Sequence, residues 1–155
     1  FFIVLLFLLL FLYLIFIVRI SPGVNDGPFF HTEFAHRGLF SDARAIPENS
    51  MKAFQEAVRQ HVGIELDVHL TKDEKVVVFH DDTLTRMCQI DALIEETSYE
   101  DLQKLPESHI EKIPLLSDVL SYVNGRVPLL IELKLPTKST RLCHEVHKLL
   151  ETYQG

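Results

Sequence analysis

The chain has little positive charge and few cysteines. It carries 15 Lys and Arg against 22 Asp and Glu, a formal net charge of -7 over 155 residues. This acidity argues against a nucleic-acid-binding protein, which needs a basic face to meet phosphates. The two cysteines, Cys88 and Cys143, neither make a disulfide framework nor match the spacing of a zinc site. We expect both to be free thiols in a reducing compartment, with a single disulfide as the alternative.

Long apolar runs are also absent, except at the N-terminus, where residues 1–18 are apolar without interruption and Arg19 follows. At about 1.5 Å per residue, a helix of this length just crosses a bilayer core of about 30 Å. A signal peptide has a shorter apolar core followed by small residues, and no such pattern follows Arg19. We therefore expect a retained transmembrane helix over residues 1–20 and a single-pass membrane protein. Since the chain begins with Phe, we also expect its N-terminal flank to be missing, so the side of the membrane is left open.

The rest of the chain contains no repeat and no low-complexity tract. Residues 21–32 have the Ser, Pro, Gly, Asn and Asp composition of a linker, and the globular part is expected over residues 33–155. Apolar strands alternate there with amphipathic helices, which is typical of a mostly parallel sheet covered by helices. The predicted strands cover residues 34–38, 63–70, 75–79 and 127–134, and the predicted helices residues 50–61, 99–105, 114–124 and 137–153. The candidate caps are Asn49 or Ser50 for the first helix and Thr97 or Ser98 for the second.

The strand predicted over residues 63–70 has two unlike faces, because apolar residues at even positions alternate with polar residues at odd positions. Glu65 and Asp67 therefore point the same way, about 7 Å apart along the strand. Two neighbouring carboxylates repel unless a positive charge lies between them, and a divalent cation with oxygen ligands meets that need. The alternative is an acidic strand edge that faces solvent.

Charged and imidazole side chains gather at or just after the ends of the predicted strands. Such groups reduce stability next to apolar strands unless a site uses them. In a (β/α)₈ barrel this rim carries the chemistry, and four strands in about 120 residues make half of a barrel that needs about 250 residues. We therefore expect an N-terminal fragment of a TIM barrel with about four β/α units. The residues at the rim are His36, Glu65, Asp67, His80, Glu132 and Lys134.

Five short blocks follow one another from about residue 34 to residue 135. They are His36-Arg37-Gly38, then Pro47-Glu48-Asn49-Ser50 with Ala53-Phe54, then Glu65-Leu66-Asp67-Val68 with Thr71-Lys72-Asp73, then Phe79-His80-Asp81 with Leu84, and finally Glu132-Leu133-Lys134. A single His-Arg-Gly would carry little weight. Five blocks in this order and at this spacing resemble the glycerophosphodiester phosphodiesterase family.

The resemblance implies a TIM barrel that uses a divalent cation, Ca²⁺ or Mg²⁺. It implies cleavage of glycerophosphodiesters, which are small-molecule or lipid-derived substrates, to glycerol 3-phosphate and an alcohol. Carried over position by position, the implied site has Glu65, Asp67 and Glu132 as metal ligands, His36 and His80 as the acid–base pair, and Arg37 and Lys134 as phosphate ligands.

Two other functions stay open at this point. A lysophospholipase D acting on membrane lysolipids is favoured by the expected membrane helix, which would hold the pocket near lipid. A catalytically inactive, membrane-tethered binding protein would be expected to lose a metal or histidine position, and all are present.

Glu48 either stabilises a helix start or supports the site, and His144 and His147 lack a carboxylate to complete a metal site. The oligomeric state is not specified.

Overall fold

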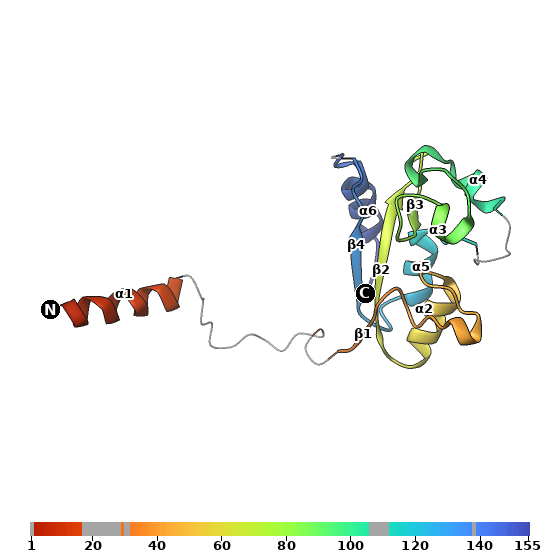
Figure 1. The fold of residues 1–155 in the computed structure, drawn as a ribbon. Coiled ribbons are helices and arrows are strands. Elements are labelled where there is room, and N and C mark those ends of the chain that lie inside the picture. Colours follow the sequence, from red (N-terminus) through yellow and green to blue (C-terminus); the bar gives the residue numbers. More distant parts are fainter. Residues whose placement is uncertain (1, 17–28, 30–31, 106–111, 138) are drawn as a thin grey trace. The chain divides into compact units, whose positions relative to one another are not determined.

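The computed structural model of the chain describes residues 2–16, 29, 32–105, 112–137 and 139–155 (Figure 1). The chain divides into two compact units, Phe1–His31 and Thr32–Gly155. The first unit contains helix α1, Phe2–Phe16, which has 15 residues. No helix in the described ranges is long and apolar enough to cross a membrane. The transmembrane helix expected over residues 1–20 is therefore not supported. Residues 1 and 17–20 of this expected helix, and residues 21–28, 30 and 31 of the expected linker, lie outside the described residues. Membrane localisation stays a prediction.

The second unit is built around strand β2, Gly63–Leu70, which pairs in parallel with β1, Phe34–Ala35, and with β4, Leu129–Leu133. The N–H of Gly63 donates to the carbonyl of Glu33 beside β1, and the N–H of Ile64 donates to the carbonyl of Pro128 beside β4. Successive residues of β2 thus bind opposite neighbours, so β1 and β4 lie on its two edges. The parallel sheet predicted from the sequence is confirmed for these three strands.

Strand β3, Val76–Val78, runs antiparallel to β2 and departs from the prediction of four β/α units. The N–H of Thr71 donates to the carbonyl of Lys75, so a tight turn joins the two strands. A parallel neighbour would need a crossover of a dozen or more residues, which this turn excludes. The N–H of Phe79 donates to the carbonyl of Asp67, on the same edge of β2 that pairs with β1. The described chain therefore has three β/α units and one hairpin.

Helices cover one face of the sheet. Alternate residues of β2, namely Ile64, Leu66 and Val68, are fully buried in an apolar core shared with α2, α5 and α6. The odd-numbered residues point to the opposite face, which in a barrel is the interior. Helix α2 begins after Ser50, whose hydroxyl accepts from the N–H of Ala53, as the predicted cap requires. The bounds are Met51–Arg59 for α2, Leu116–Val123 for α5 and Arg141–Glu151 for α6.

A second apolar cluster forms a small lobe that follows β3 (Figure 1). Its described elements are short, and one of them, α4, starts at Tyr99 as predicted, with Ser98 as its cap. The lobe packs around Val77, Phe79, Leu84, Ile94, Leu102 and Ile113. It holds α3 near the ends of β2 and β3, which matters for the site below. Its elements are α3, Thr85–Cys88, the 3₁₀ turn η2, Ile94–Glu96, and α4, Tyr99–Gln103, while a further 3₁₀ turn, η1, Asp42–Arg44, precedes α2. Cys88 and Cys143 are free thiols, as expected.

Candidate active site

The turn after β1 carries His36 and Arg37 toward the edge of the sheet. Arg37 and Gly38 both have positive φ, 59° and 79°. A Cβ on Gly38 would lie 2.8 Å from Cβ of Ala53, so helix α2 packs directly against the backbone of this turn. Only glycine combines this conformation with this close approach. The turn is therefore fixed against α2, and with it the two side chains that precede Gly38.

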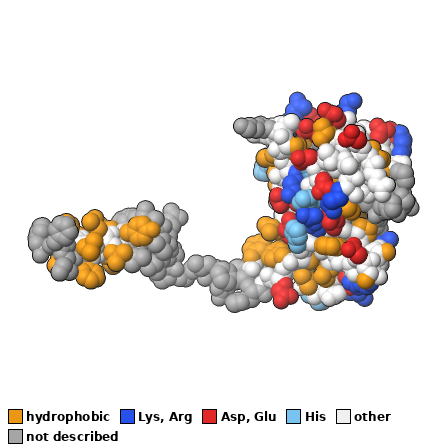
Figure 2. Space-filling model, in the orientation of Figure 1, with side chains coloured by type: hydrophobic (Ala, Val, Ile, Leu, Met, Phe, Trp, Pro, Cys, Tyr) orange, Lys and Arg blue, Asp and Glu red, His pale blue; other side chains and the backbone are white. Residues whose placement is uncertain are grey.

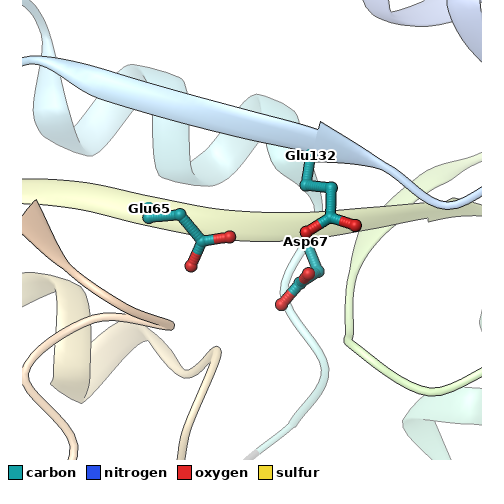
Figure 3. Close-up of side chains that lie close together, drawn as sticks. All are labelled: Glu65, Asp67 and Glu132. Carbon is teal, nitrogen blue, oxygen red and sulfur yellow. The ribbon is translucent and has the colours of Figure 1, made fainter.

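Three carboxylates meet on the face of the sheet away from the helices (Figure 3). Glu65 and Asp67 lie two positions apart on β2 and so share one face of the sheet, and Glu132 on β4 is the register partner of Asp67. One oxygen of each lies within 4.8 Å of the others. The convergence of the acidic pair with Glu132, expected from the sequence, follows from parallel pairing with this register.

Asp67 tests whether this group fits a cation. Its side chain is 1% exposed, and its Oδ2 accepts from Nδ2 of Asn49 at 2.9 Å. Its Oδ1 is buried and makes no hydrogen bond within the described residues, although Nζ of Lys134 lies 3.0 Å away. A buried carboxylate oxygen without a hydrogen bond needs a positive charge beside it, which the Lys134 ammonium provides and a divalent cation could provide instead. With Glu65 and Glu132, Asp67 completes a set of three carboxylate oxygen ligands, which fits Ca²⁺ or Mg²⁺.

Asp67 and Lys134 are both charged at neutral pH. Burial raises the pKa of Asp67, but Asn49 and Lys134 outweigh it, so the pKa lies below its ordinary value. Burial lowers the pKa of Lys134, but Glu132 and Asp67 outweigh it and raise the pKa. Nζ of Lys134 lies 2.6 Å from Oε1 of Glu132 as well as beside Asp67. The ammonium thus bridges two of the three carboxylates.

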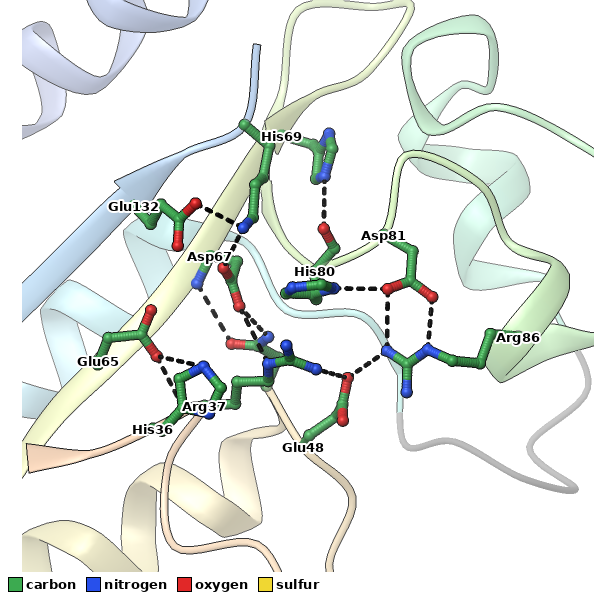
Figure 4. A network of polar contacts seen from close by, with 12 residues as sticks. His36, Arg37, Glu48, Glu65, Asp67, His69, His80, Asp81, Arg86 and Glu132 are labelled. Carbon is green, nitrogen blue, oxygen red and sulfur yellow. Dashed lines mark hydrogen bonds and ion pairs between the residues drawn. The ribbon is translucent and has the colours of Figure 1, made fainter. Parts of the chain in front are cut away.

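The two predicted catalytic histidines lie on either side of this cluster (Figure 4). Nε2 of His36 is 3.9 Å from Oε2 of Glu65, and the His36 side chain is 68% exposed. His80 reaches the site because antiparallel β3 pairs Val78 with Val68 and so returns alongside Asp67. Its Nδ1 lies 2.6 Å from Oδ1 of Asp81. A hairpin, rather than one of the four β/α units expected from the sequence, therefore places His80.

Arg37 lies between the carboxylates and the loop before α2. Its backbone N–H donates to Oε2 of Glu65 at 2.9 Å, and its Nη1 donates to Oε1 of Glu48 at 3.1 Å. Its Nε lies 3.7 Å from Oδ2 of Asp67 and makes no hydrogen bond within the described residues. Arg37 thus retains a buried donor at the site, as a phosphate ligand would. Figure 2 shows the resulting mixture of basic, acidic and histidine side chains on this face of the second unit.

Several site residues were not predicted from the sequence. The sequence indicates Asn49 as a candidate helix cap, but Ser50 caps α2 and the Asn49 amide donates to Asp67. His69 was given no role, yet it is 1% exposed and its Nε2 lies 3.2 Å from the carbonyl oxygen of His80. Burial lowers the pKa of His69 and favours its neutral form. Its odd position in β2, after Glu65 and Asp67, was the available signal. His144 and His147 take part in no metal-ligand cluster in the described ranges.

Comparison with known proteins agrees with this geometry. Residues 36–153 match the Glycerophosphoryl diester phosphodiesterase family. The chain belongs to this family. A glycerophosphodiester phosphodiesterase of Bacillus altitudinis is 39% identical over 110 residues, covering 66% of this chain and 44% of that protein. The human lysophospholipase D GDPD1 is 33% identical over 139 residues, covering 81% of this chain and 42% of that protein.

Solved structures of family members have the same fold. A phosphodiesterase of Oleispira antarctica in complex with the product sn-glycerol-3-phosphate has a TM-score of 0.68 and 29% identity, covering 80% of this chain and 53% of that one. A glycerophosphodiester phosphodiesterase of Thermotoga maritima has a TM-score of 0.67 and 30% identity, covering 80% and 51%. The chain spans about half the length of the relatives that it matches.

Proposed function

We propose that residues 33–155 carry the metal-binding and acid–base part of a hydrolase that cleaves glycerophosphodiesters to glycerol 3-phosphate and an alcohol. The observation that carries this proposal is the approach of Glu65, Asp67 and Glu132 to within 4.8 Å of one another. Family membership supports it, and so does the Oleispira antarctica relative, whose structure holds sn-glycerol-3-phosphate.

The charges of the site suit an anionic substrate. Glu65, Asp67 and Glu132 would hold a divalent cation, which when bound would supply positive charge at the phosphate. Three carboxylates outweigh such a cation by one negative charge, which Arg37 and Lys134 offset. The side chains of Arg37 and Lys134 would both contact the phosphate oxygens as negative charge develops on these oxygens.

The histidines move the protons. In the hydrolysis, an oxygen nucleophile forms a bond to phosphorus while the bond from phosphorus to the alcohol oxygen breaks. One imidazole, in its neutral form, takes the proton of the nucleophile, and the other, in its protonated form, gives a proton to the departing alkoxide. Because Asp81 engages Nδ1 of His80, Nε2 is the nitrogen of His80 that is free to exchange a proton. General acid–base catalysis contributes about 10²–10⁴-fold, so the cations must supply much of the rest.

The test is hydrolysis by the protein expressed with any segments that flank residues 1–155. We expect glycerol 3-phosphate to be released from glycerophosphocholine with Ca²⁺ or Mg²⁺ and not in excess EDTA. Glu132→Gln should raise the cation concentration needed for half-maximal activity by at least about tenfold. The matched control is Glu145→Gln, because Glu145 pairs with Lys148 on α6, outside the carboxylate cluster. Full activity in EDTA would exclude cation-assisted hydrolysis.

A second substrate class is supported by the 33% identity to human lysophospholipase D GDPD1. We propose lysophospholipids as the alternative substrates of the same site, since the bond that breaks is of the same kind. Parallel assays with glycerophosphocholine and lysophosphatidylcholine separate the two possibilities. A kcat/KM at least about tenfold higher for the lysolipid would make lysophospholipase D the better description.

A further inference from the structure

Arg86 on α3 contacts acidic residues from two separate parts of the site (Figure 4). Its Nε lies 2.6 Å from Oδ2 of Asp81, and its Nη2 lies 3.0 Å from Oδ1 of the same residue. The same Nη2 lies 2.5 Å from Oε1 of Glu48. The guanidinium thus binds Asp81 with two nitrogens and also reaches the loop before α2, a geometry that a lysine cannot reproduce.

Each of these two acids touches a residue that the proposed reaction uses. Oδ1 of Asp81 lies 2.6 Å from Nδ1 of His80, and Oε1 of Glu48 accepts from Nη1 of Arg37 at 3.1 Å. Arg86 is therefore connected to His80 of the acid–base pair through Asp81. It is connected to the phosphate ligand Arg37 through Glu48.

We propose that Arg86 is a positioning residue that holds His80 through Asp81 and Arg37 through Glu48. This role rests on the proposed function. It keeps the proton-transferring ring and the phosphate ligand at a fixed separation, although they follow two different strands, β3 and β1, along one edge of β2. Arg86 itself touches no reacting atom in this arrangement.

The state of charge and the packing support the link. Arg86 lowers the pKa of Asp81 to about 2. Burial raises the pKa of Glu48, but Arg86 and Arg37 outweigh it and lower the pKa below its usual range. Both acids therefore stay ionised at neutral pH. Leu84, which directly precedes α3, is 1% exposed in the core of the lobe, and Met87 on α3 packs against that core. The backbone that carries Arg86 is thus held in place by the packing of its neighbours.

The competing explanation is a surface ion pair that only ties the lobe to the sheet. The Arg86 side chain is 47% exposed, and exposed ion pairs contribute little to stability. A tie of this kind would change the free energy of unfolding and leave the kinetic constants of the folded protein unchanged. A positioning role changes the kinetic constants of protein that is fully folded.

The experiment compares Arg86→Ala and Arg86→Lys with a matched control, Arg59→Ala. Arg59 pairs with Glu56 on the outer side of α2 and contacts no site residue in the described ranges. With glycerophosphocholine, Arg86→Ala should lower kcat about 10- to 100-fold, and calorimetry should show weaker binding of glycerol 3-phosphate. Arg86→Lys should recover only part of both losses, because its ammonium lacks the guanidinium fork. Arg59→Ala should keep wild-type values.

Double variants test the contact through Glu48 and the contact through Asp81 separately. If Arg86 acts on Arg37 through Glu48, Arg86→Ala should not weaken glycerol 3-phosphate binding further in a Glu48→Gln background. If it acts on His80 through Asp81, Arg86→Ala should not lower kcat further in an Asp81→Asn background. Two results would overturn the positioning role: additive losses in the double variants, or wild-type kcat and affinity in folded Arg86→Ala. Neither result affects the proposed function as long as the wild-type protein is active. An inactive wild type overturns the proposed function and the positioning role with it.

Discussion

Nζ of Lys134 lies 3.0 Å from Oδ1 of Asp67, the buried carboxylate oxygen that makes no hydrogen bond within the described residues. The ammonium also lies 2.6 Å from Glu132, so it occupies space between two of the three carboxylates. It provides the positive charge that these oxygens need when no cation is bound. A bound cation and this ammonium therefore repel each other, and they compete for the same oxygens.

Lys134→Met should increase the affinity for the divalent cation and decrease the affinity for glycerol 3-phosphate. A unit charge about 4 Å from another is worth about 1 kcal/mol even in water, which corresponds to about fivefold tighter cation binding. Titration calorimetry with Ca²⁺ or Mg²⁺ measures the first effect and titration with glycerol 3-phosphate the second. Lys148→Met, which removes an exposed cation on α6, is the matched control. Weaker cation binding in Lys134→Met would show that the ammonium supports the site rather than competing for it.

The two site histidines should be essential to turnover and dispensable for folding. His36→Ala and His80→Ala should each lower kcat at least about 100-fold, because each removes a proton-transferring group. Thermal unfolding should be nearly unchanged for His36→Ala, since that side chain is 68% exposed. His147→Ala, on the exposed face of α6, should keep the wild-type kcat. Near-normal turnover in either site variant would remove that histidine from the chemistry.

The carboxylate cluster could be predicted from the sequence because one short pattern determines most of it. Alternation in β2 puts Glu65 and Asp67 on one face, and parallel pairing then needs only the register to bring in Glu132. The antiparallel direction of β3 was also contained in the sequence, since residues 71–75 form a turn too short for a crossover. The prediction of about four β/α units was wrong here, because it counted residues 75–79 as the strand of a separate unit, whereas the short turn makes them the second strand of a hairpin.

Arg86 could not be predicted from the sequence. The described elements of the lobe that carries it are helices and turns of three to five residues, too short to leave a helical period. Its core draws single apolar residues from positions spread between Val77 and Ile113. The contacts of Arg86 with Glu48, 38 positions away, depend on how this lobe packs against the sheet. Only the three-dimensional structure brings those two residues together.

Asp81 should make stability depend on pH in the acid range. Its pKa is about 2 in the folded protein, mainly because Arg86 binds it, against about 3.9 in an unfolded chain. The unfolded chain therefore takes up a proton first, so this contribution is complete above about pH 4 and is lost as the pH falls toward 2. Asp81→Asn should flatten the fall in the free energy of unfolding over that window by about 1–2 kcal/mol, after allowance for solvent screening. Urea unfolding at a series of pH values measures it, and an unchanged slope would contradict it.

Gly38 should be needed both for stability and for the site. Its φ is +79°, and a Cβ there would lie 2.8 Å from Cβ of Ala53, so Gly38→Ala combines backbone strain with overlap. We expect a loss of about 2–4 kcal/mol in the free energy of unfolding. The turn can relieve the overlap only by moving away from α2, which displaces His36 and Arg37. Folded Gly38→Ala should therefore also bind glycerol 3-phosphate more weakly.

Two further variants separate the causes of that loss. Gly125 also has a positive φ, +71°, but lies near the C-terminus, where a Cβ would approach the carbonyl oxygen of Gln154 at 3.0 Å. Gly125→Ala should lower stability and leave ligand affinity unchanged, because no site residue is attached to that turn. Adding Ala53→Gly to Gly38→Ala removes the closest contact and leaves the strained φ, so it should restore affinity more than stability. Equal effects of the two glycine variants on affinity would show that the turn after β1 tolerates displacement, and that contacts of Arg37 with Glu48 and Glu65 hold the site without it.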